Sequence, residues 1–213
     1  MRGRKAGESL DVDGIQYGRG MADTKQTKTI GEHYAAAELA RRGWAPAFTR
    51  DGLARTDILA VMTEGVDRRL VEIQVKATRH VVGGRISWML GEKAQMPSLH
   101  DREFFVLVAV PLQADVPPRF FVVPRTHLAA AAWIQHMAWL TDPSIPAGAR
   151  NASVNQARVS VDVFTAYESR WDFLMLDDPD VPVLLPRHMR GWALEDRVGL
   201  PPGHPWAEHL PDW

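Results

Sequence analysis

Residues 69–77 read Arg-Leu-Val-Glu-Ile-Gln-Val-Lys-Ala, and this stretch decides the fold. Side chains of a strand alternate between two faces, so the Val, Ile and Val of this run point into one packed layer. Glu72, Gln74 and Lys76 then share the other face. Three polar groups in a row on a strand otherwise suited to a core have two interpretations. They form the solvated face of a half-exposed strand, or they carry chemistry.

An acidic residue stands at the start of the preceding apolar run. Asp57 is followed by the apolar residues 58–62, and a polar turn containing Gly65 leads on to residues 69–77. Antiparallel pairing of the two runs brings Asp57 toward one end of the polar row. A carboxylate, a carboxamide oxygen and a lysine beside a sheet form a hard-metal site with a cation next to it. Such oxygen ligands suit Mg²⁺, which commonly takes one or two carboxylates and keeps several waters.

The segments on either side predict helices and further strands. Residues 30–42 favour a helix, which Thr27 or Thr29 can cap and Gly43 ends. An Ala-rich helix is expected at 126–140, a short helix at 167–176, and residues 159–164 are ambiguous. Strands are expected at 44–50, 57–62, 69–77, 85–90, 104–111 and 120–123. The order of helix, several strands and helix predicts an α/β domain with a mixed central sheet flanked by helices.

At these residues the sequence resembles the PD-(D/E)xK nuclease superfamily. The resemblance rests on Asp57 in Arg-Thr-Asp-Ile-Leu-Ala, on Gln74-Val75-Lys76 seventeen residues later, and on Glu32 in the preceding helix. It is closest to the branch with a QxK tripeptide, which includes homing- and restriction-endonuclease-like proteins and uncharacterised bacterial members. The match spans about residues 30–125. It implies a restriction-endonuclease-like αβββαβ core.

The resemblance also implies roles for the site residues. Glu32 and Asp57 help to bind Mg²⁺, with Mn²⁺ as a substitute, and Lys76 orients or polarises the attacking water. Gln74 stands where most members have Asp or Glu. The metal is therefore held more weakly, or Glu72 on the same face contributes as a ligand. Glu32 has a simpler interpretation too, as a first-turn acid favoured by the helix dipole.

The function expected from this site is metal-dependent endonucleolytic hydrolysis of DNA phosphodiester bonds. Arg55, Arg79 and Arg85 flank the site and are candidate phosphate contacts. The alternative is a catalytically inactive nuclease-fold module that binds DNA or a partner protein. The net charge of −1, from 25 basic and 26 acidic residues, favours this alternative because it does not indicate a nucleic-acid binder.

Composition excludes several other classes. The 213 residues contain no cysteine, which excludes disulfide scaffolds and thiolate sites. No apolar run reaches 18 residues, and no apolar stretch follows the basic N-terminus, so neither a membrane span nor a secretory signal is expected. A cytoplasmic protein is the expectation, and a homodimer is left open.

The chain divides into three zones. Residues 1–28 are polar and Gly-containing and are expected to form a flexible extension. Residues 29–176 form the nuclease-like domain. Residues 177–213 are rich in proline, which forbids long helices and central strands there. The tryptophans of this tail favour burial, so the tail is expected to pack on the domain, where it offers a surface for a protein partner.

Overall fold

A computed structural model describes residues 24–49, 53–65 and 68–213 of the chain. Its first element is helix α1 (Thr24–Ala40). Residues 24–28, which the sequence assigned to a flexible extension, therefore lie in this helix, and that boundary was wrong. The reason is that Thr27 is buried even though its surroundings in the sequence are polar. The rest of the expected extension, residues 1–23, lies outside the described residues.

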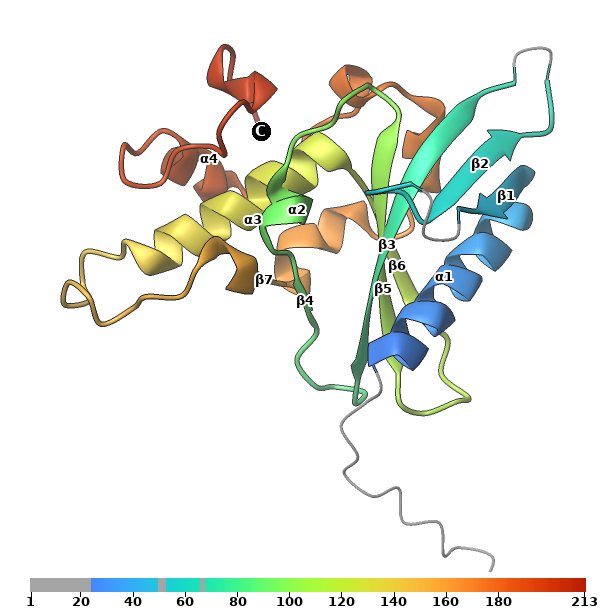
Figure 1. Cartoon of the computed structure of the whole chain (residues 1–213), viewed down its shortest axis with the longest axis horizontal. Coiled ribbons are helices and arrows are strands. Elements are labelled where there is room, and N and C mark those ends of the chain that lie inside the picture. Colours follow the sequence, from blue (N-terminus) through green and yellow to red (C-terminus); the bar gives the residue numbers. More distant parts are fainter. Residues whose placement is uncertain (1–23, 50–52, 66–67) are drawn as a thin grey trace, which may run out of the picture.

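The central element is a five-stranded mixed sheet (Figure 1). Its strands, in chain order, are β1 (Trp44–Phe48), β2 (Ile58–Met62), β3 (Leu70–His80), β5 (Glu103–Pro111) and β6 (Arg119–Pro124). They lie side by side in that same order. β3 and β5 are parallel, and the other neighbours are antiparallel. Helix α1 covers one face and helix α3 (Arg125–Leu140) packs against the other, which confirms the expected α/β class.

One edge of β3 is open over half of its length. β2 pairs with β3 only from Leu70 to Ile73, whereas β5 accompanies β3 from Glu72 to His80. In Figure 1, β2 leaves β3 at this point, and β3 continues beside α1 with β5 on its other edge. The strand residues just beyond the last pair are Gln74, Val75 and Lys76, so the polar row leads into the open edge.

The connection from β3 to β5 departs from the central sheet. The strand expected at 85–90 is β4 (Ser87–Met89), but it pairs with β7 (Arg158–Ser160) in a separate two-stranded sheet. Helix α2 (Glu92–Gln95) follows and is a single turn. The second long helix, α3, comes only after β6.

The remaining short helices are of the 3-10 type. They span Val154–Gln156, Val161–Tyr167, Trp171–Met175, Asp178–Asp180 and Pro205–Ala207. The ambiguous segment 159–164 is thus the end of β7 and the start of one such helix. The short helix expected at 167–176 covers only Trp171–Met175, because Ser169 adopts a positive φ of 56° and interrupts the helical backbone before it.

The core is centred on β5, every residue of which is buried. A central strand covered on both faces is expected to be a continuous apolar run rather than an alternating one, and Phe104–Ala109 follow that pattern. Trp88 of β4 packs edge-on against Phe121 of β6, at 5.4 Å between ring centroids. The small two-stranded sheet thereby closes the side of the core away from α1.

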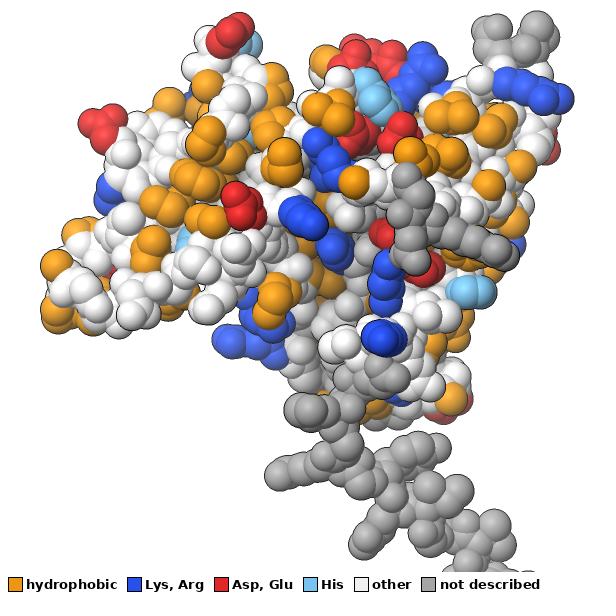
Figure 2. All heavy atoms as spheres, viewed as in Figure 1, with side chains coloured by type: hydrophobic (Ala, Val, Ile, Leu, Met, Phe, Trp, Pro, Cys, Tyr) orange, Lys and Arg blue, Asp and Glu red, His pale blue; other side chains and the backbone are white. Residues whose placement is uncertain are grey.

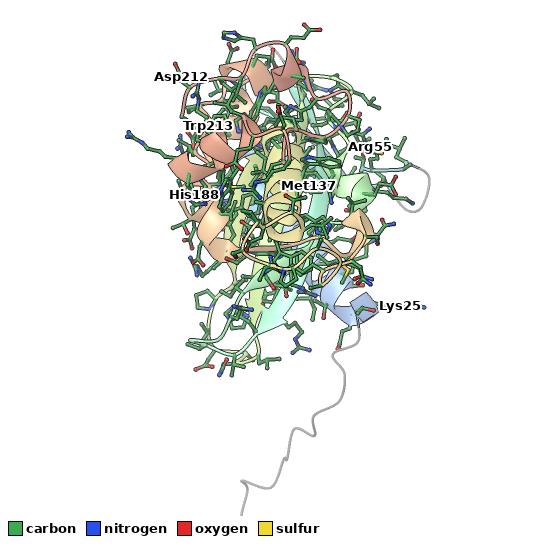
Figure 3. All side chains as sticks on the ribbon, turned by 90° about the vertical axis from the view of Figure 1, so that its left-hand side faces the viewer. Lys25, Arg55, Met137, His188, Asp212 and Trp213 are labelled. Carbon is green, nitrogen blue, oxygen red and sulfur yellow. The ribbon has the colours of Figure 1, made fainter. Side chains whose placement is uncertain are left out.

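The C-terminal tail lies against α3. Its helix α4 (Arg187–Ala193) is short. The Trp133 indole nitrogen donates to the Val198 carbonyl at 2.9 Å, and His204 Nε2 donates to the Thr126 carbonyl at 3.0 Å. Figure 3 looks toward α3, with Trp213 and His188 of the tail on one side of Met137 and Arg55 on the other. In the described parts of the chain, no helix has the length and apolar character needed to cross a membrane.

Candidate functional site

Asp57 is fixed at the open edge of β3 by two backbone contacts. Its own N–H donates to the Ile73 carbonyl at 2.9 Å, as the last step of the β2–β3 pairing. Its Oδ2 accepts a hydrogen bond from the Val75 N–H at 2.8 Å. The carboxylate thus satisfies a strand donor that β2 no longer reaches. The expected approach of Asp57 to the polar row is present in the structure.

Glu32 reaches the same place from α1. The helix approaches β3 closely because residue 31 is glycine: a Cβ there would lie 2.4 Å from the Ala77 Cβ. The side chains of Glu32 and Asp57 are each 17% exposed. Burial raises the pKa of Glu32, and the neighbouring Asp57 carboxylate raises it further, against the opposing effect of Lys28. Two carboxylates therefore share one partly desolvated space.

Lys28, which sequence reasoning missed, joins these two carboxylates. Its Nζ lies 3.3 Å from Glu32 Oε1 and 3.5 Å from Asp57 Oδ1. Burial alone would lower the Lys28 pKa, but Asp57 and Glu32 raise it above its usual value. The sequence feature that could have revealed this contact is the four-residue spacing of Lys28 and Glu32, which places them on one helix face.

Lys76 lies on the face of β3 that carries Gln74 and is partly buried. Burial lowers its pKa, and Lys28, Arg125 and Lys93 lower it further against the pull of Asp57. These cations come from α1, α3 and α2, so three separate elements direct positive charge toward one strand lysine. Figure 2 shows Lys and Arg side chains gathered in a band between α2 and the N-terminal end of α1.

Gln74 belongs to a buried polar network around Arg125, the first residue of α3. Arg125 is 1% exposed. Its Nη2 donates to Gln74 Oε1 at 3.0 Å and to the Arg55 carbonyl at 3.0 Å. Its Nε lies 2.6 Å from Glu103 Oε2, which also pairs with Arg55 Nη2 at 3.1 Å. Burial and the nearby Arg55 lower the pKa of Arg125 to about 10, so it keeps its charge at neutral pH.

Glu72 is not brought to the carboxylate pair. Its Oε2 accepts from the Thr56 hydroxyl at 2.6 Å, and its Oε1 lies 3.2 Å from His100 Nε2. The reason is its position along the strand, because Glu72 lies where β3 is still paired with β2. The structure therefore separates Glu72 from Glu32 and Asp57, although it shares the strand face of Gln74.

The three arginines expected to contact phosphates occupy different environments. Arg55 is committed to the buried network and also donates to the Pro97 carbonyl at 2.6 Å. Arg79 lies on the opposite face of β3 from Lys76, where it lines a small hollow with Ile30 of α1. Arg85 is exposed. Of the three, only Arg85 has a freely accessible side chain.

The carboxylate pair fits a magnesium ion that retains waters. No three His, Cys, Asp or Glu side chains within residues 24–49, 53–65 and 68–213 form a group that could hold a metal. Glu32 and Asp57 nevertheless supply the one or two carboxylates that Mg²⁺ commonly takes. The Lys28 ammonium, which contacts both, occupies a position that attracts a cation. Because the Lys28 side chain is 59% exposed, it can swing away into solvent.

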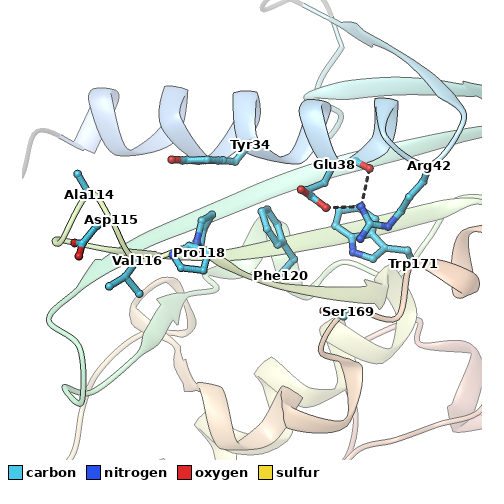
Figure 4. A pocket seen from close by; sticks show the side chains of 11 residues that line it. Tyr34, Glu38, Arg42, Ala114, Asp115, Val116, Pro118, Phe120, Ser169 and Trp171 are labelled. Atoms are coloured by element: carbon cyan, nitrogen blue, oxygen red, sulfur yellow. Dashed lines mark hydrogen bonds and ion pairs between the residues drawn. The ribbon is translucent and has the colours of Figure 1, made fainter.

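A separate hollow lies on the other side of α1 from this edge. A cleft of about 500 Å³ lies between the outer side of α1 and the β5–β6 connection (Figure 4). Glu38, its main acid, is fully engaged by Arg41 and Arg42. Arg42 in turn stacks on Trp171, 4.6 Å from the ring centroid. The other acid of the cleft, Asp115, is exposed on the β5–β6 connection, and the only cation among the described residues of the lining, Arg42, is already paired, so the cleft suits an anion less well than the open edge of β3.

Comparison with protein-family models, with curated proteins and with solved structures gives no match to this chain.

Proposed function

We propose that this protein is a magnesium-dependent nuclease that hydrolyses phosphodiester bonds in DNA, with a restriction-endonuclease-like arrangement of the PD-(D/E)xK type. The observation that supports it most is the convergence of Glu32, Asp57 and Lys76 at the open edge of β3. Their charges are coupled, because Asp57 influences the pKa of both Glu32 and Lys76. The three residues come from α1, from the position just before β2 and from β3, so the fold rather than local sequence assembles them.

The roles follow from the charge that develops during hydrolysis. Glu32 and Asp57 would hold Mg²⁺, with Mn²⁺ as a substitute. An ion held there would supply positive charge that stabilises the charge developing on the phosphate, and it would activate water for attack. Lys76 is a compact point charge that can hold the attacking water or pair with the phosphate. Its lowered pKa makes release of its proton easier than for an ordinary lysine.

The local charge suits a polyanionic substrate although the whole chain carries −1. Lys28 and Lys93 are exposed on the two sides of Lys76, on α1 and α2. Contacts of this kind to phosphates give affinity and position without sequence information. Net charge alone is a poor guide here, because the acids of the remaining chain offset the basic band.

The direct test is a cleavage assay on supercoiled, linear, single-stranded and branched DNA with Mg²⁺, Mn²⁺ or EDTA. We expect cleavage of at least one form with Mg²⁺ or Mn²⁺ and none with EDTA. Cleavage that persists in EDTA would contradict the metal-dependent mechanism. Absence of cleavage under every condition would contradict the catalytic function.

A non-catalytic module that binds DNA or a protein is the second candidate. The observation that favours it is the balance of charge at the site, because Lys28 already neutralises part of the Glu32–Asp57 pair. Gln74 also lacks the charge of the usual carboxylate. On this alternative, replacing Asp57 by Asn, which keeps an oxygen for the Val75 N–H, leaves partner binding intact. On the nuclease proposal, the same change removes metal binding and cleavage together.

A further inference from the structure

The orientation of the Gln74 amide is determined by its neighbour. A guanidinium has only N–H donors, so the group that Gln74 presents to Arg125 has to be its oxygen. The structure agrees, with Gln74 Oε1 3.0 Å from Arg125 Nη2. The Gln74 NH₂ group is then the end that does not face Arg125.

The buried guanidinium also disfavours a metal on that oxygen. Arg125 is 1% exposed and cannot turn out into solvent. A divalent ion on Gln74 Oε1 would share one neutral oxygen with this cation, with no negative charge between them. The acid that balances Arg125 is Glu103, whose Oε2 lies 2.6 Å from Arg125 Nε and not from the nitrogen that contacts Gln74. Gln74 is therefore a poor metal ligand in this structure.

The Gln74 amide nitrogen remains as a donor that an anion could accept from. No partner for the Gln74 amide nitrogen is found among the described residues, and the Nη1 of Arg125 is buried without a hydrogen-bond partner there. Gln74 and Lys76 are two residues apart on one strand face, roughly 6.6 Å along β3, so their tips can converge on a single group. Lys28 and Lys93 add positive charge nearby.

We propose that Arg125 is a positioning residue that turns Gln74 into a hydrogen-bond donor for a substrate phosphate. Gln74 Nε2 and Lys76 Nζ together hold a phosphodiester anion of a nucleic-acid strand, while Glu32 and Asp57 hold the metal. The glutamine at this position thus binds substrate and not the ion. This inference rests on the proposed function for the identity of its ligand, and it assigns to Gln74 a different role from the ligand role that the sequence suggested.

Gln74→Glu separates the two roles. The new carboxylate would pair with Arg125 and repel a phosphate. The variant side chain would also lack the NH₂ donor of glutamine. We expect binding of a fluorescein-labelled 20-mer DNA in EDTA, followed by anisotropy, to weaken at least fivefold. Calorimetric Mg²⁺ and Mn²⁺ affinities should stay within twofold of wild type, because Gln74 is not a ligand. In a cleavage assay, KM should rise more than kcat falls.

Two further variants serve as controls. Gln156→Glu makes the same change of charge at an exposed glutamine outside the site and should bind DNA as wild type does. Gln74→Met removes the donor without adding a charge. It should weaken DNA binding as well, and it replaces Gln74→Glu if circular dichroism shows that Gln74→Glu does not fold.

Each outcome is decisive. Unchanged DNA affinity in both Gln74 variants overturns the inference, as does metal affinity that tightens fivefold or more in Gln74→Glu. Failure of the wild-type protein to bind any DNA overturns it too. If the wild type cleaves no DNA but the Gln74 variants still lose binding, the proposed catalytic function fails and the phosphate-binding role stands.

Discussion

The Asp57 carboxylate takes the place of a missing neighbouring strand for Val75. Its Oδ2 accepts the Val75 N–H at 2.8 Å, just where β2 stops pairing with β3. One oxygen is thus structural, while Oδ1 faces Lys28 at 3.5 Å. The same side chain holds the strand edge and presents a charge to the site, so removing it altogether would confuse two effects.

Asp57→Asn separates these effects. Asparagine keeps an oxygen for the Val75 N–H but removes one of the two carboxylate charges. We expect the variant to melt within a few degrees of wild type and to lose at least tenfold in calorimetric affinity for Mg²⁺ and Mn²⁺. Asp162→Asn, an exposed acid outside the site, is the matched control. Undiminished metal affinity in Asp57→Asn would remove Asp57 from the metal site.

Lys28→Met tests whether the lysine competes with the metal. The ammonium contacts both carboxylates and has to leave before an ion can enter. Exposed ion pairs contribute only about 0.2–1 kcal/mol, so we expect metal affinity to tighten by no more than about fivefold. Lys25→Met is a comparison at an exposed lysine of the same helix. Weaker metal binding in Lys28→Met would mean that Lys28 supports the site instead of competing for it.

Lys76→Met tests the catalytic role. The aliphatic stem is kept, so the fold should be retained, and metal should bind at least as well because a nearby cation is gone. The cleavage rate should fall by about 100-fold or more, the usual scale for removing one electrostatic stabiliser. DNA affinity should fall only modestly, as for one lost phosphate contact. Equal rates for wild type and Lys76→Met, with Lys25→Met as a surface control, would rule out this role.

The local pattern of the sequence was sufficient to predict most of the sheet and part of the site. The alternation in residues 69–77 predicted β3, and the short turn after residue 62 predicted the antiparallel partner that carries Asp57. Both predictions rest on residues that are close together along the chain, and a single sequence shows such local patterns directly. The pairing of Asp57 with the polar row followed from that register.

The residues that were missed depend on contacts that sequence does not report. Arg125 reaches Gln74 across 51 positions of the chain, so no local pattern pairs them. Lys28 was assigned to the extension because residues 24–28 lack an apolar face, yet packing against β3 continues the helix there. Glu72 and Gln74 share a strand face, but the pairing of β2 with β3 ends at Ile73. Glu72 therefore lies in the paired part of β3, and Gln74 lies at the open edge.

Gly31→Ala tests the close packing that brings Glu32 to the site. Alanine favours a helix by about 1 kcal/mol over glycine, but its Cβ would lie 2.4 Å from the Ala77 Cβ. Overpacking of this kind typically costs about 1–3 kcal/mol, so the clash outweighs the propensity. We expect a lower free energy of unfolding in urea and weaker metal binding as α1 moves outward.

Gly191→Ala is the matched helical control, because nothing lies within 4 Å of a Cβ there. It should be neutral or slightly stabilising. The double variant Gly31→Ala with Ala77→Gly removes the clashing methyl and should recover part of the lost stability. If Gly31→Ala is as stable as wild type, α1 does not need the close approach.

The stability of the protein should fall in mild acid because two buried histidines anchor the tail to α3. Burial, with the nearby His204, lowers the pKa of His127 to about 3, and burial lowers that of His204 to about 4. His204 Nε2 donates to the Thr126 carbonyl, and His127 Nδ1 accepts from the Tyr167 hydroxyl. His204 Nδ1 also accepts from the Trp206 N–H at 3.2 Å, and both acceptor nitrogens require neutral rings. In the unfolded chain the two rings titrate near pH 6.5, so the unfolded state binds more protons below that pH.

The stabilisation is therefore complete above about pH 6.5 and is lost as the pH falls toward 4, by roughly 2 kcal/mol for each histidine at pH 5. Burial raises the pKa of Asp178, which faces His127 at 3.7 Å, and this carboxyl works in the opposite direction as it becomes protonated.

The variant His204→Gln isolates the effect of one ring, because glutamine keeps a donor for the Thr126 carbonyl. We expect urea unfolding at pH 7.5 and at pH 5 to show that the free energy of unfolding falls by about 2 kcal/mol less in His204→Gln than in wild type. His188→Gln, at an exposed position of α4, should follow the wild-type slope. Parallel slopes for wild type and His204→Gln would mean that His204 does not remain neutral in the folded protein.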